Sequence, residues 1–282
     1  MIIPGSESQA FAAALADASG ESLGRVEYED FADGESVVRV PDEIDRAVVV
    51  ASTVSDHAHV ELLQLQDAAR EAGADELLTV LPYMGYARQD EAFRTGEPVS
   101  SRAMARAISS GTDRVLTVNP HEDTVCEFFD VPAEPVDAAG VLADPLPADL
   151  DEPLFLSPDE GAVDIATTVR DAYGRGTVDY FQKDRDYDTG AVDISPSDAA
   201  VADRDVVVAD DIIATGSTMS EAVGVLNDRG AGRVFVSCVH PMLAANAQTK
   251  LASAGVERVY GTDTIERAVS DVSAASAVAE RL

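Results

Sequence analysis

Val206-Val-Val-Ala-Asp-Asp-Ile-Ile-Ala-Thr-Gly-Ser-Thr218 carries the strongest structural signal in the chain. Its apolar run, residues 206–209, predicts a buried parallel strand. Two carboxylates, Asp210 and Asp211, follow the strand, and small residues with hydroxyl groups follow them. Apolar residues then recur at helical spacing until Gly230: Met219, Ala222, Val223 and Leu226. The predicted order is strand, acidic pair, small-residue loop and helix.

This order of elements suits a sugar phosphate. Backbone amides at a helix N-terminus bind phosphate because they lack internal partners and lie at the positive end of the helix dipole. Two neighbouring carboxylates suit sugar hydroxyls, or a magnesium ion held through water. The alternative is a plain turn with an Asp N-cap, but a cap needs only one acid. The segment resembles the signature of the phosphoribosyl-diphosphate-binding family, which includes phosphoribosyltransferases and the synthetases that make their co-substrate.

Length and composition allow two ordinary domains in 282 residues. Hydrophobic residues make up 46% but aromatics only 5%, so the cores must rest on Val, Leu, Ile and Ala. No run approaches the roughly 20 apolar residues of a membrane span, and no signal peptide is evident, so a cytoplasmic protein is expected. Cys126 and Cys238 fit no disulfide or zinc pattern.

The charge balance is strongly acidic, with 52 Asp and Glu against 20 Lys and Arg and a net charge of -32. A phosphate backbone would be repelled, which argues against nucleic acid as a partner. Acid-rich composition with only two lysines resembles the cytosolic proteins of salt-accumulating halophiles. Repulsion should strain the fold in dilute buffer and fade in about 1 M salt, where the Debye length is about 3 Å.

An internal repeat indicates the fold class. Asp45-Arg-Ala-Val-Val-Val-Ala51 and Asp203-Arg-Asp-Val-Val-Val-Ala209 lie at an offset of 158 and each begins a strand–helix–strand pattern. We therefore expect an α/β protein with two tandem domains, each a mostly parallel sheet flanked by helices. The first copy has Ser52-Thr-Val-Ser55 in place of the acids, so it should lack the sugar-phosphate site. The Pro- and Ala-rich residues 131–147 suggest a domain boundary near residue 140.

Further candidates follow other predicted strands. His121 and Asp159 each come after an apolar strand, and ligands of open α/β sheets lie at the carboxyl ends of strands. They could bind one metal, although a lone histidine is more often structural. Lys183 also lies at a strand end, where a compact point charge suits phosphate. The other lysine, Lys250, is interpreted as an ordinary surface residue.

Two polar segments are predicted as functional loops. Residues 82–98 are too long for a tight turn, and within them Arg88 and Gln89 could contact a nucleotide. Residues 186–198 are predicted as a mobile flap. Beyond them we expect a last strand at residues 258–261 and a helical region from 265 to the end.

Seven motifs together resemble the ribose-phosphate pyrophosphokinase family, and they keep that family's order over nearly the whole chain. Simple phosphoribosyltransferases lack the 86–90 loop and the N-terminal half-repeat. The motifs are Phe31-Ala-Asp-Gly-Glu35, Tyr86-Ala-Arg-Gln-Asp90, Pro120-His121 with Phe128-Phe129-Asp130, Ser157-Pro-Asp159, Lys183-Asp-Arg185, residues 210–218 and His240-Pro241.

The resemblance implies roles for individual residues. ATP would contact Asp33, Gly34, Glu35, Arg88 and Gln89. Mg2+ would be held by His121 and Asp159. Lys183 and Arg185 would be catalytic and face the transferred phosphates. Ribose 5-phosphate would contact Arg185, Asp210, Asp211, Ala214, Thr215, Gly216, Ser217 and Thr218. Two positions depart from the family pattern: Ala214 stands where Asp is frequent, and Asp184 where a second base is frequent.

The implied reaction transfers the diphosphate group of Mg-ATP to the anomeric hydroxyl of ribose 5-phosphate, giving phosphoribosyl diphosphate and AMP. Two phosphoribosyltransferase-like domains are implied, residues 1–140 and 141–267, with residues 268–282 returning to the first. A homo-oligomer is also implied, because the family's ATP site takes the Asp-Gly-Glu turn from an adjacent subunit. A non-catalytic, synthetase-associated regulatory subunit and a phosphoribosyltransferase remain alternatives.

Overall fold

The structure is a computed structural model that describes residues 1–185, 192–196 and 199–282. The chain divides into two compact units. Unit 1 comprises Met1–Ala138, Asp263–Glu266 and Ser273–Leu282, and unit 2 comprises Ala139–Thr262 and Arg267–Val272. The end of the chain therefore belongs to unit 1, where the last helix contacts the first.

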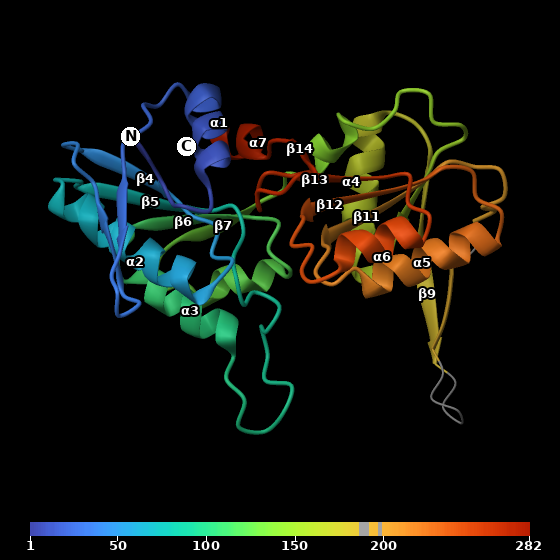
Figure 1. Ribbon diagram of the computed structural model, residues 1–282, viewed down its shortest axis with the longest axis horizontal. Helices are drawn as coiled ribbons and strands as arrows, with labels where there is room; N and C mark the ends of the chain where they lie inside the picture. The colour runs from blue at the N-terminus through green and yellow to red at the C-terminus, as the bar shows by residue number, and fades with distance from the viewer. Residues whose placement is uncertain (186–191, 197–198) are drawn as a thin grey trace. The chain divides into compact units, whose positions relative to one another are not determined.

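Unit 1 is built on a five-stranded parallel sheet with the order β1-β4-β5-β6-β7. Its strands are β1 (Ile2–Pro4), β4 (Arg46–Val50), β5 (Glu76–Leu81), β6 (Arg114–Val118) and β7 (Ala133–Val136). Figure 1 shows α2 (Asp56–Glu71) and α3 (Ser100–Ser109) on one face, and α1 (Gln9–Ser19) and α7 (Ala275–Ala279) on the other. A separate antiparallel pair, β2 (Glu27–Asp30) and β3 (Ser36–Arg39), and the 3-10 helix η1 (Asp123–Phe128) complete it.

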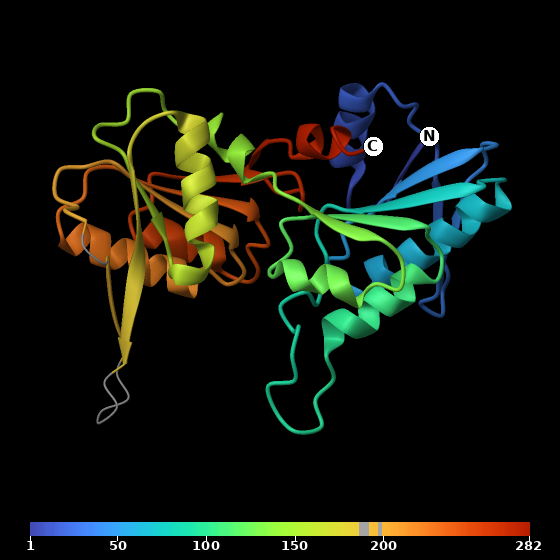
Figure 2. The same cartoon turned by 180° about the vertical axis from the view of Figure 1, so that it is seen from behind.

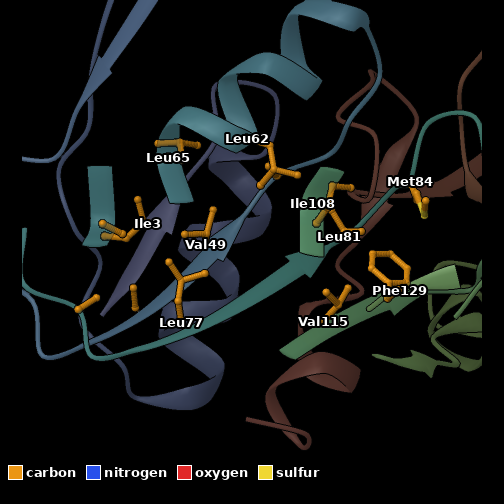
Figure 3. Close-up of a cluster of buried hydrophobic side chains, with 14 of the residues drawn as sticks. Ile3, Val49, Leu62, Leu65, Leu77, Leu81, Met84, Ile108, Val115 and Phe129 are labelled. Carbon is orange, nitrogen blue, oxygen red and sulfur yellow. The ribbon is translucent and has the colours of Figure 1, made fainter. Parts of the chain in front are cut away.

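Aliphatic side chains form the core of unit 1, as its composition requires. Figure 3 shows Val49 and Leu77 of neighbouring strands facing Leu62 and Leu65 of α2, with Ile3 beside them. All five are completely buried. Strands covered on both faces carry continuous apolar runs rather than alternation, which explains why the sequence signal of β4 and β5 was strong.

Unit 2 contains a seven-stranded sheet with the order β10-β9-β8-β11-β12-β13-β14, parallel except where β10 joins β9. Its strands are β8 (Leu154–Ser157), β9 (Thr177–Arg185), β10 (Val192–Pro196), β11 (Val206–Ile212), β12 (Val234–His240), β13 (Arg258–Thr262) and β14 (Ser270–Val272). Figure 2, from behind, shows α4 (Val163–Tyr173) on the face opposite to α5 (Ser217–Asp228) and α6 (Ala247–Ser253). Two short 3-10 helices are η2 (Ala139–Ala143) and η3 (Glu160–Ala162).

The predicted helix after the acidic pair is confirmed as α5. Its buried residues are the four that the spacing selected: Met219, Ala222, Val223 and Leu226. They pack into the core of unit 2 against the apolar residues of β11 and β12. The predicted α/β architecture with mostly parallel sheets is confirmed in both units.

The strand–helix–strand repeat is present in both units, but the pairing of its two strands differs by two residues. Arg46 pairs with Glu76, 30 positions later, whereas Val206 pairs with Val234, 28 positions later. One copy is therefore two residues longer between its strands. Since side chains in a strand alternate with a period of two, this shift leaves each residue on the same face of the sheet.

Three other predictions are corrected. Within the predicted flap, residues 192–196 form β10, because Val192 and Ile194 alternate with polar residues in a way that allows pairing with β9. The remainder, residues 186–191 and 197–198, lies outside the described part of the chain. Residues 258–261 belong to β13, which β14 follows, and the expected closing helix is reduced to α7. Among the described residues, no helix combines the length and apolar character needed to cross a membrane.

The two sheets differ in how their strands wind. In unit 2, α4 connects β8 to β9 on one side, while β11 lies on the other side of β8. The winding direction therefore reverses between β8 and β11, and open α/β sheets bind ligands at such a reversal. In unit 1, β1 pairs with β4 alone among the described strands, and every later strand is added on that side. Within the described ranges, unit 2 has the strand order that creates a ligand site of this kind and unit 1 does not.

Candidate functional site

The acidic pair lies at the carboxyl end of β11, beside the point where winding reverses. Asp210 and Asp211 are both half-buried. The Asp210 Oδ1 accepts a hydrogen bond from the Asp211 amide at 3.0 Å, and the Asp211 Oδ1 accepts one from the Ile212 amide at 2.7 Å. Asp159 follows β8, which pairs directly with β11. Asp210 and Asp211 thus belong to the last residues of β11, where the sequence placed them after the strand, and Asp159 follows the adjacent strand.

This concentration of acid changes the titration of Asp210. Burial raises the pKa of Asp210 well above its usual range, and repulsion from Asp211 adds to the rise. A smaller contribution comes from the negative charge of Asp159. The site therefore favours a ligand that brings positive charge, or hydroxyl groups that donate hydrogen bonds to these oxygens.

We expect Asp210→Asn to stabilise the fold while removing an acceptor from the site. An acid whose pKa is raised by folding holds more protons in the native state, so its contribution to stability falls as pH rises through that raised pKa. The melting temperature of Asp210→Asn should exceed that of the original protein by at least about 2 °C at pH 8, the shift that about 1 kcal/mol produces at this size.

The same comparison at pH 5 provides the control. Because the Asp210 carboxyl holds its proton more often there, the difference between the two melting temperatures should shrink. Calorimetry in molar KCl measures both values. A difference that stays constant from pH 5 to pH 8 would show that Asp210 titrates normally.

The small-residue loop brings backbone amides next to the acids. Gly216 is the N-cap residue of α5 and has a φ of 69°, a left-handed conformation that glycine adopts without strain. An added Cβ would approach the Cβ of Ala247 to 3.3 Å. Among the described residues, no side chain caps this helix. Thr215 and Ser217 place hydroxyl oxygens 3.4 Å apart at the same end, next to amides available for an anion.

In unit 1 the start of α2, which is equivalent to the start of α5, carries a side-chain cap. The Ser55 side chain caps α2 by accepting a hydrogen bond from the Ala58 amide at 3.1 Å. Ser52 and Thr53, which follow β4, are buried, and the Ser52 hydroxyl donates to the carbonyl of Thr264 at 2.5 Å. At the start of α2, unit 1 thus has neither paired acids nor uncapped amides.

The two metal candidates lie in different units. Asp159 is the N-cap of η3, and its Oδ1 accepts a hydrogen bond from the Gly161 amide at 3.2 Å. His121 is exposed in unit 1, after β6. Within the described ranges, no three His, Cys, Asp or Glu side chains form a group that could hold a metal ion. The magnesium assignment stays a prediction.

The two catalytic candidates lie on β9, the strand next to β8. The backbone of Lys183 pairs with Ile194 and that of Arg185 with Val192. Their side chains lie outside what the structure describes. The strand positions place both backbones in unit 2, the unit with the acidic pair.

The Asp-Gly-Glu turn connects β2 to β3 in unit 1. Asp33, Gly34 and Glu35 are all exposed. Gly34 has a φ of 91°, and the Asp33 carboxylate accepts a hydrogen bond from the Glu35 amide at 3.2 Å. Asp33 therefore helps to shape the turn through its side chain, whereas Glu35 does so through its carbonyl, which accepts a hydrogen bond from the Phe31 amide at 2.7 Å.

The beginning of the 82–98 loop is firmly anchored. The Gly85 amide donates to the Thr53 hydroxyl at 2.8 Å, and a Cβ at Gly85 would lie 2.1 Å from the Thr53 carbonyl oxygen. Tyr86 has a φ of 64°, and its hydroxyl donates to the Asp56 carboxylate at 2.6 Å. The next residue but one, Arg88, is exposed.

Gln89 is held in place more fully than Arg88. Its side-chain oxygen accepts a hydrogen bond from the Ser100 hydroxyl at 2.6 Å, and its carbonyl accepts from the Ser101 amide and hydroxyl. The loop is thus tied to the first turn of α3. The structure orders the backbone on both sides of Arg88 and leaves its side chain accessible.

Sequence reasoning missed Lys250. Its ammonium donates to the Ser217 hydroxyl at 2.8 Å and to the Thr215 carbonyl at 3.3 Å. Lys250 is thus half-buried and contacts the loop before α5, a contact that its interpretation as an ordinary surface lysine did not include. The sequence offered one indication of this contact: lysine is rare, because 18 of the 20 basic side chains are arginines and only two are lysines.

The fold and the site together define a protein with two α/β units, one of which has paired carboxylates beside a helix N-terminus without a side-chain cap. Residues 1–111 match the N-terminal domain of ribose phosphate pyrophosphokinase, and residues 138–276 match the phosphoribosyl transferase domain. The chain belongs to the ribose-phosphate pyrophosphokinase family.

Relatives resemble the chain over its whole length. A ribose-phosphate pyrophosphokinase of Halobacterium salinarum is 65% identical, with both chains covered completely. One of Methanosarcina mazei is 43% identical and covers 100% of this chain and 94% of its own. The crystal structure of a phosphoribosylpyrophosphate synthetase from Mycobacterium smegmatis matches with a TM-score of 0.85 at 27% identity, covering 100% of this chain and 96% of that one.

Proposed function

We infer that the protein makes phosphoribosyl diphosphate and AMP from ATP and ribose 5-phosphate, for nucleotide biosynthesis. The observation that carries this inference is the 65% identity, end to end, with a ribose-phosphate pyrophosphokinase. The acidic pair and the uncapped loop of unit 2 supply the chemistry that ribose 5-phosphate requires. The relatives do not favour a regulatory subunit or a phosphoribosyltransferase.

Ribose 5-phosphate is assigned to unit 2. Its 5-phosphate would bind the amides and hydroxyls of residues 214–218, and its ring hydroxyls would donate to Asp210 and Asp211. The uncapped N-terminus of α5 and the raised pKa of Asp210 support this assignment. Ala214 contributes backbone alone, because a methyl group cannot replace a carboxylate.

ATP is assigned to the turn and loop of unit 1. Asp33, Gly34 and Glu35 would contact the nucleotide together with Arg88 and Gln89. The exposure of the turn and of Arg88 supports this assignment. We place the domain boundary near residue 140, where the chain passes from unit 1 to unit 2.

Catalysis is proposed to proceed by direct displacement. The anomeric hydroxyl of ribose 5-phosphate attacks the β-phosphorus of ATP and forms a new O–P bond. The bond between the β-phosphorus and the oxygen bridging it to the α-phosphorus breaks, AMP leaves with that oxygen, and the hydroxyl proton is released to solvent. No covalent enzyme intermediate is required, because positioning and charge stabilisation carry such transfers. Lys183, with Arg185 and Arg88, would stabilise the charge that develops on the transferred group.

Magnesium is proposed as the cofactor that neutralises the phosphates of ATP. Asp159 fits it, because carboxylate oxygens are the ligands that magnesium prefers, whereas the imidazole nitrogen of His121 is a ligand more typical of transition metals. Asp159 and His121 are the assigned residues. The repulsion among Asp159, Asp210 and Asp211 supports a cation at this edge of unit 2, since positive charge would relieve it.

One assay tests the proposed function. Protein in molar KCl is supplied with ATP, ribose 5-phosphate and magnesium, and AMP is followed. AMP that forms only when ribose 5-phosphate is present supports the synthetase reaction. If no AMP forms at any salt concentration while the fold is intact, the regulatory or binding role is favoured instead.

We further propose a homo-oligomer whose ATP site includes the turn of an adjacent subunit. Large hydrophobic side chains that are exposed among the described residues all belong to unit 1, including Tyr28, Phe31 and Val37 of the β2–β3 hairpin and Val60 of α2. Three of these residues belong to one hairpin, and contiguous exposed apolar residues mark interaction surfaces. Neither nucleic acid nor membrane is proposed as a partner, and the strongly acidic composition fits a cytoplasm rich in salt.

Light scattering in molar KCl should give a molar mass that is a multiple of the chain's 29.6 kDa. Phe31→Asp should lower that mass, because a charge is costly in an apolar interface. An active protein with the mass of one chain would refute the shared ATP site.

A further inference from the structure

Lys250 lies against the loop to which the 5-phosphate is assigned. Its Nζ is 2.8 Å from the Ser217 Oγ and 3.3 Å from the Thr215 carbonyl oxygen. The lysine comes from α6, which packs beside α5 in unit 2. This contact joins residues 33 positions apart, so it is a product of helix packing and not of local sequence.

The direction of these hydrogen bonds is fixed by chemistry. An ammonium group can only donate, so the Ser217 oxygen must accept from Lys250 and keeps its own proton for another acceptor. The Thr215 hydroxyl, 3.4 Å away, is one possible acceptor, and an anion on the loop is another. The two bonds recorded for Lys250 also leave the third proton of its ammonium group available.

Lys250 forms no ion pair with a carboxylate of the described residues, although the chain has 52 acids for 20 bases. In molar salt the Debye length is about 3 Å, so a cation acts mainly on groups that it touches. The groups that Lys250 touches belong to the phosphate loop.

The choice of lysine fits this position. The chain uses arginine for 18 of its 20 basic side chains, and arginine binds planar partners through a rigid fork. A compact ammonium can reach a hydroxyl, a carbonyl and a phosphate oxygen from one point. We propose that Lys250 binds the 5-phosphate of ribose 5-phosphate, directly and through the Ser217 hydroxyl. This proposal deepens the proposed function and depends on its assignment of the 5-phosphate to this loop.

The test compares two variants that remove the same charge from opposite ends of the α5 region. Lys250→Met removes the ammonium and keeps an unbranched apolar stem. Arg229→Met removes a cation from the exposed C-terminal end of α5, far along the helix from the loop. Lys250→Arg restores the charge. Matching circular dichroism spectra in molar KCl would establish that all variants are folded.

Calorimetric titration with ribose 5-phosphate is the first measurement, because it does not require turnover. Lys250→Met should weaken binding about tenfold or more, the usual effect of losing a hydrogen bond to a charged group. Arg229→Met should bind like the original protein, and Lys250→Arg should lie closer to the original than Lys250→Met does. Equal affinity in Lys250→Met and the original protein, or no binding by either, would overturn the proposal.

Steady-state kinetics distinguish the loss of a phosphate contact from a change in the conformation of the loop. In Lys250→Met the KM should rise for ribose 5-phosphate and, in the reverse reaction, for phosphoribosyl diphosphate, because both carry the 5-phosphate. The KM for ATP and kcat should stay within about threefold. A loss confined to kcat would overturn the proposal. If no variant forms AMP but ribose 5-phosphate binding still depends on Lys250, the proposed function fails while this inference stands.

Discussion

Lys183→Ala should lower kcat by about 100-fold or more, the typical loss when one group that stabilises transition-state charge is removed. The KM for ribose 5-phosphate should change little, since the sugar phosphate is assigned to residues of β11 and α5. The proposed attack on the β-phosphorus moves negative charge onto the transferred group and the leaving AMP. The protein has a net charge of -32, so its overall electrostatic potential does not stabilise this negative charge, and a local cation must do so.

Steady-state assays in molar KCl measure this effect, with Arg229→Ala as the control for loss of one positive charge. The pattern should be opposite to that of Lys250→Met, which is expected to raise KM and spare kcat. Because the backbone of Lys183 lies in β9, circular dichroism must show that the strand survives the substitution. Equal and small effects of Lys183→Ala and Arg229→Ala would identify Lys183 as a surface residue and reject this mechanism.

The fold should be lost when salt is withdrawn. Fifty-two acids face only 20 basic side chains, so most carboxylates have no cationic partner. The Debye length is about 3 Å in 1 M salt and exceeds about 10 Å below 0.1 M, so dilution lets repulsion act between distant carboxylates. This self-repulsion destabilises the compact state.

Circular dichroism at molar and at roughly 0.05 M KCl gives a direct measurement, with loss of the helical signal expected at the lower concentration. Restoring the ionic strength with NaCl should restore the spectrum, because screening does not depend on which monovalent salt supplies it. A spectrum unchanged between the two KCl concentrations would contradict the halophilic interpretation.

The sequence alone determined the features that depend on near neighbours along the chain. The apolar run before Asp210 predicted β11, and the spacing of the apolar residues after Gly216 predicted the buried face of α5. The uncapped loop between them followed from the same stretch. These predictions held because strand and helix periodicities are set within a few residues, and a buried parallel strand needs a continuous apolar run.

Local patterns were less informative where packing decides. In α2 the structure buries His59, Glu61 and Gln66, whereas Val60 is 50% exposed. The Glu61 carboxylate accepts a hydrogen bond from the Ser6 amide at 2.7 Å. The side-chain amide of Gln66 donates to the Thr79 hydroxyl and to the Ile108 carbonyl. The Glu61 carboxylate and the Gln66 amide nitrogen are buried here because distant backbone and hydroxyl groups supply their partners, which no periodicity reveals.

The chemistry of the site divides in the same way. The residue types of the acidic pair and of the small-residue loop could be read from one stretch of 13 residues. Three features could not be read from the sequence. They are the strand order that makes unit 2 rather than unit 1 suitable for a ligand, the burial that raises the pKa of Asp210, and the contact between Lys250 and Ser217. Each depends on segments that are far apart in the sequence and meet only when the sheet and its helices pack, so only the tertiary structure decided them.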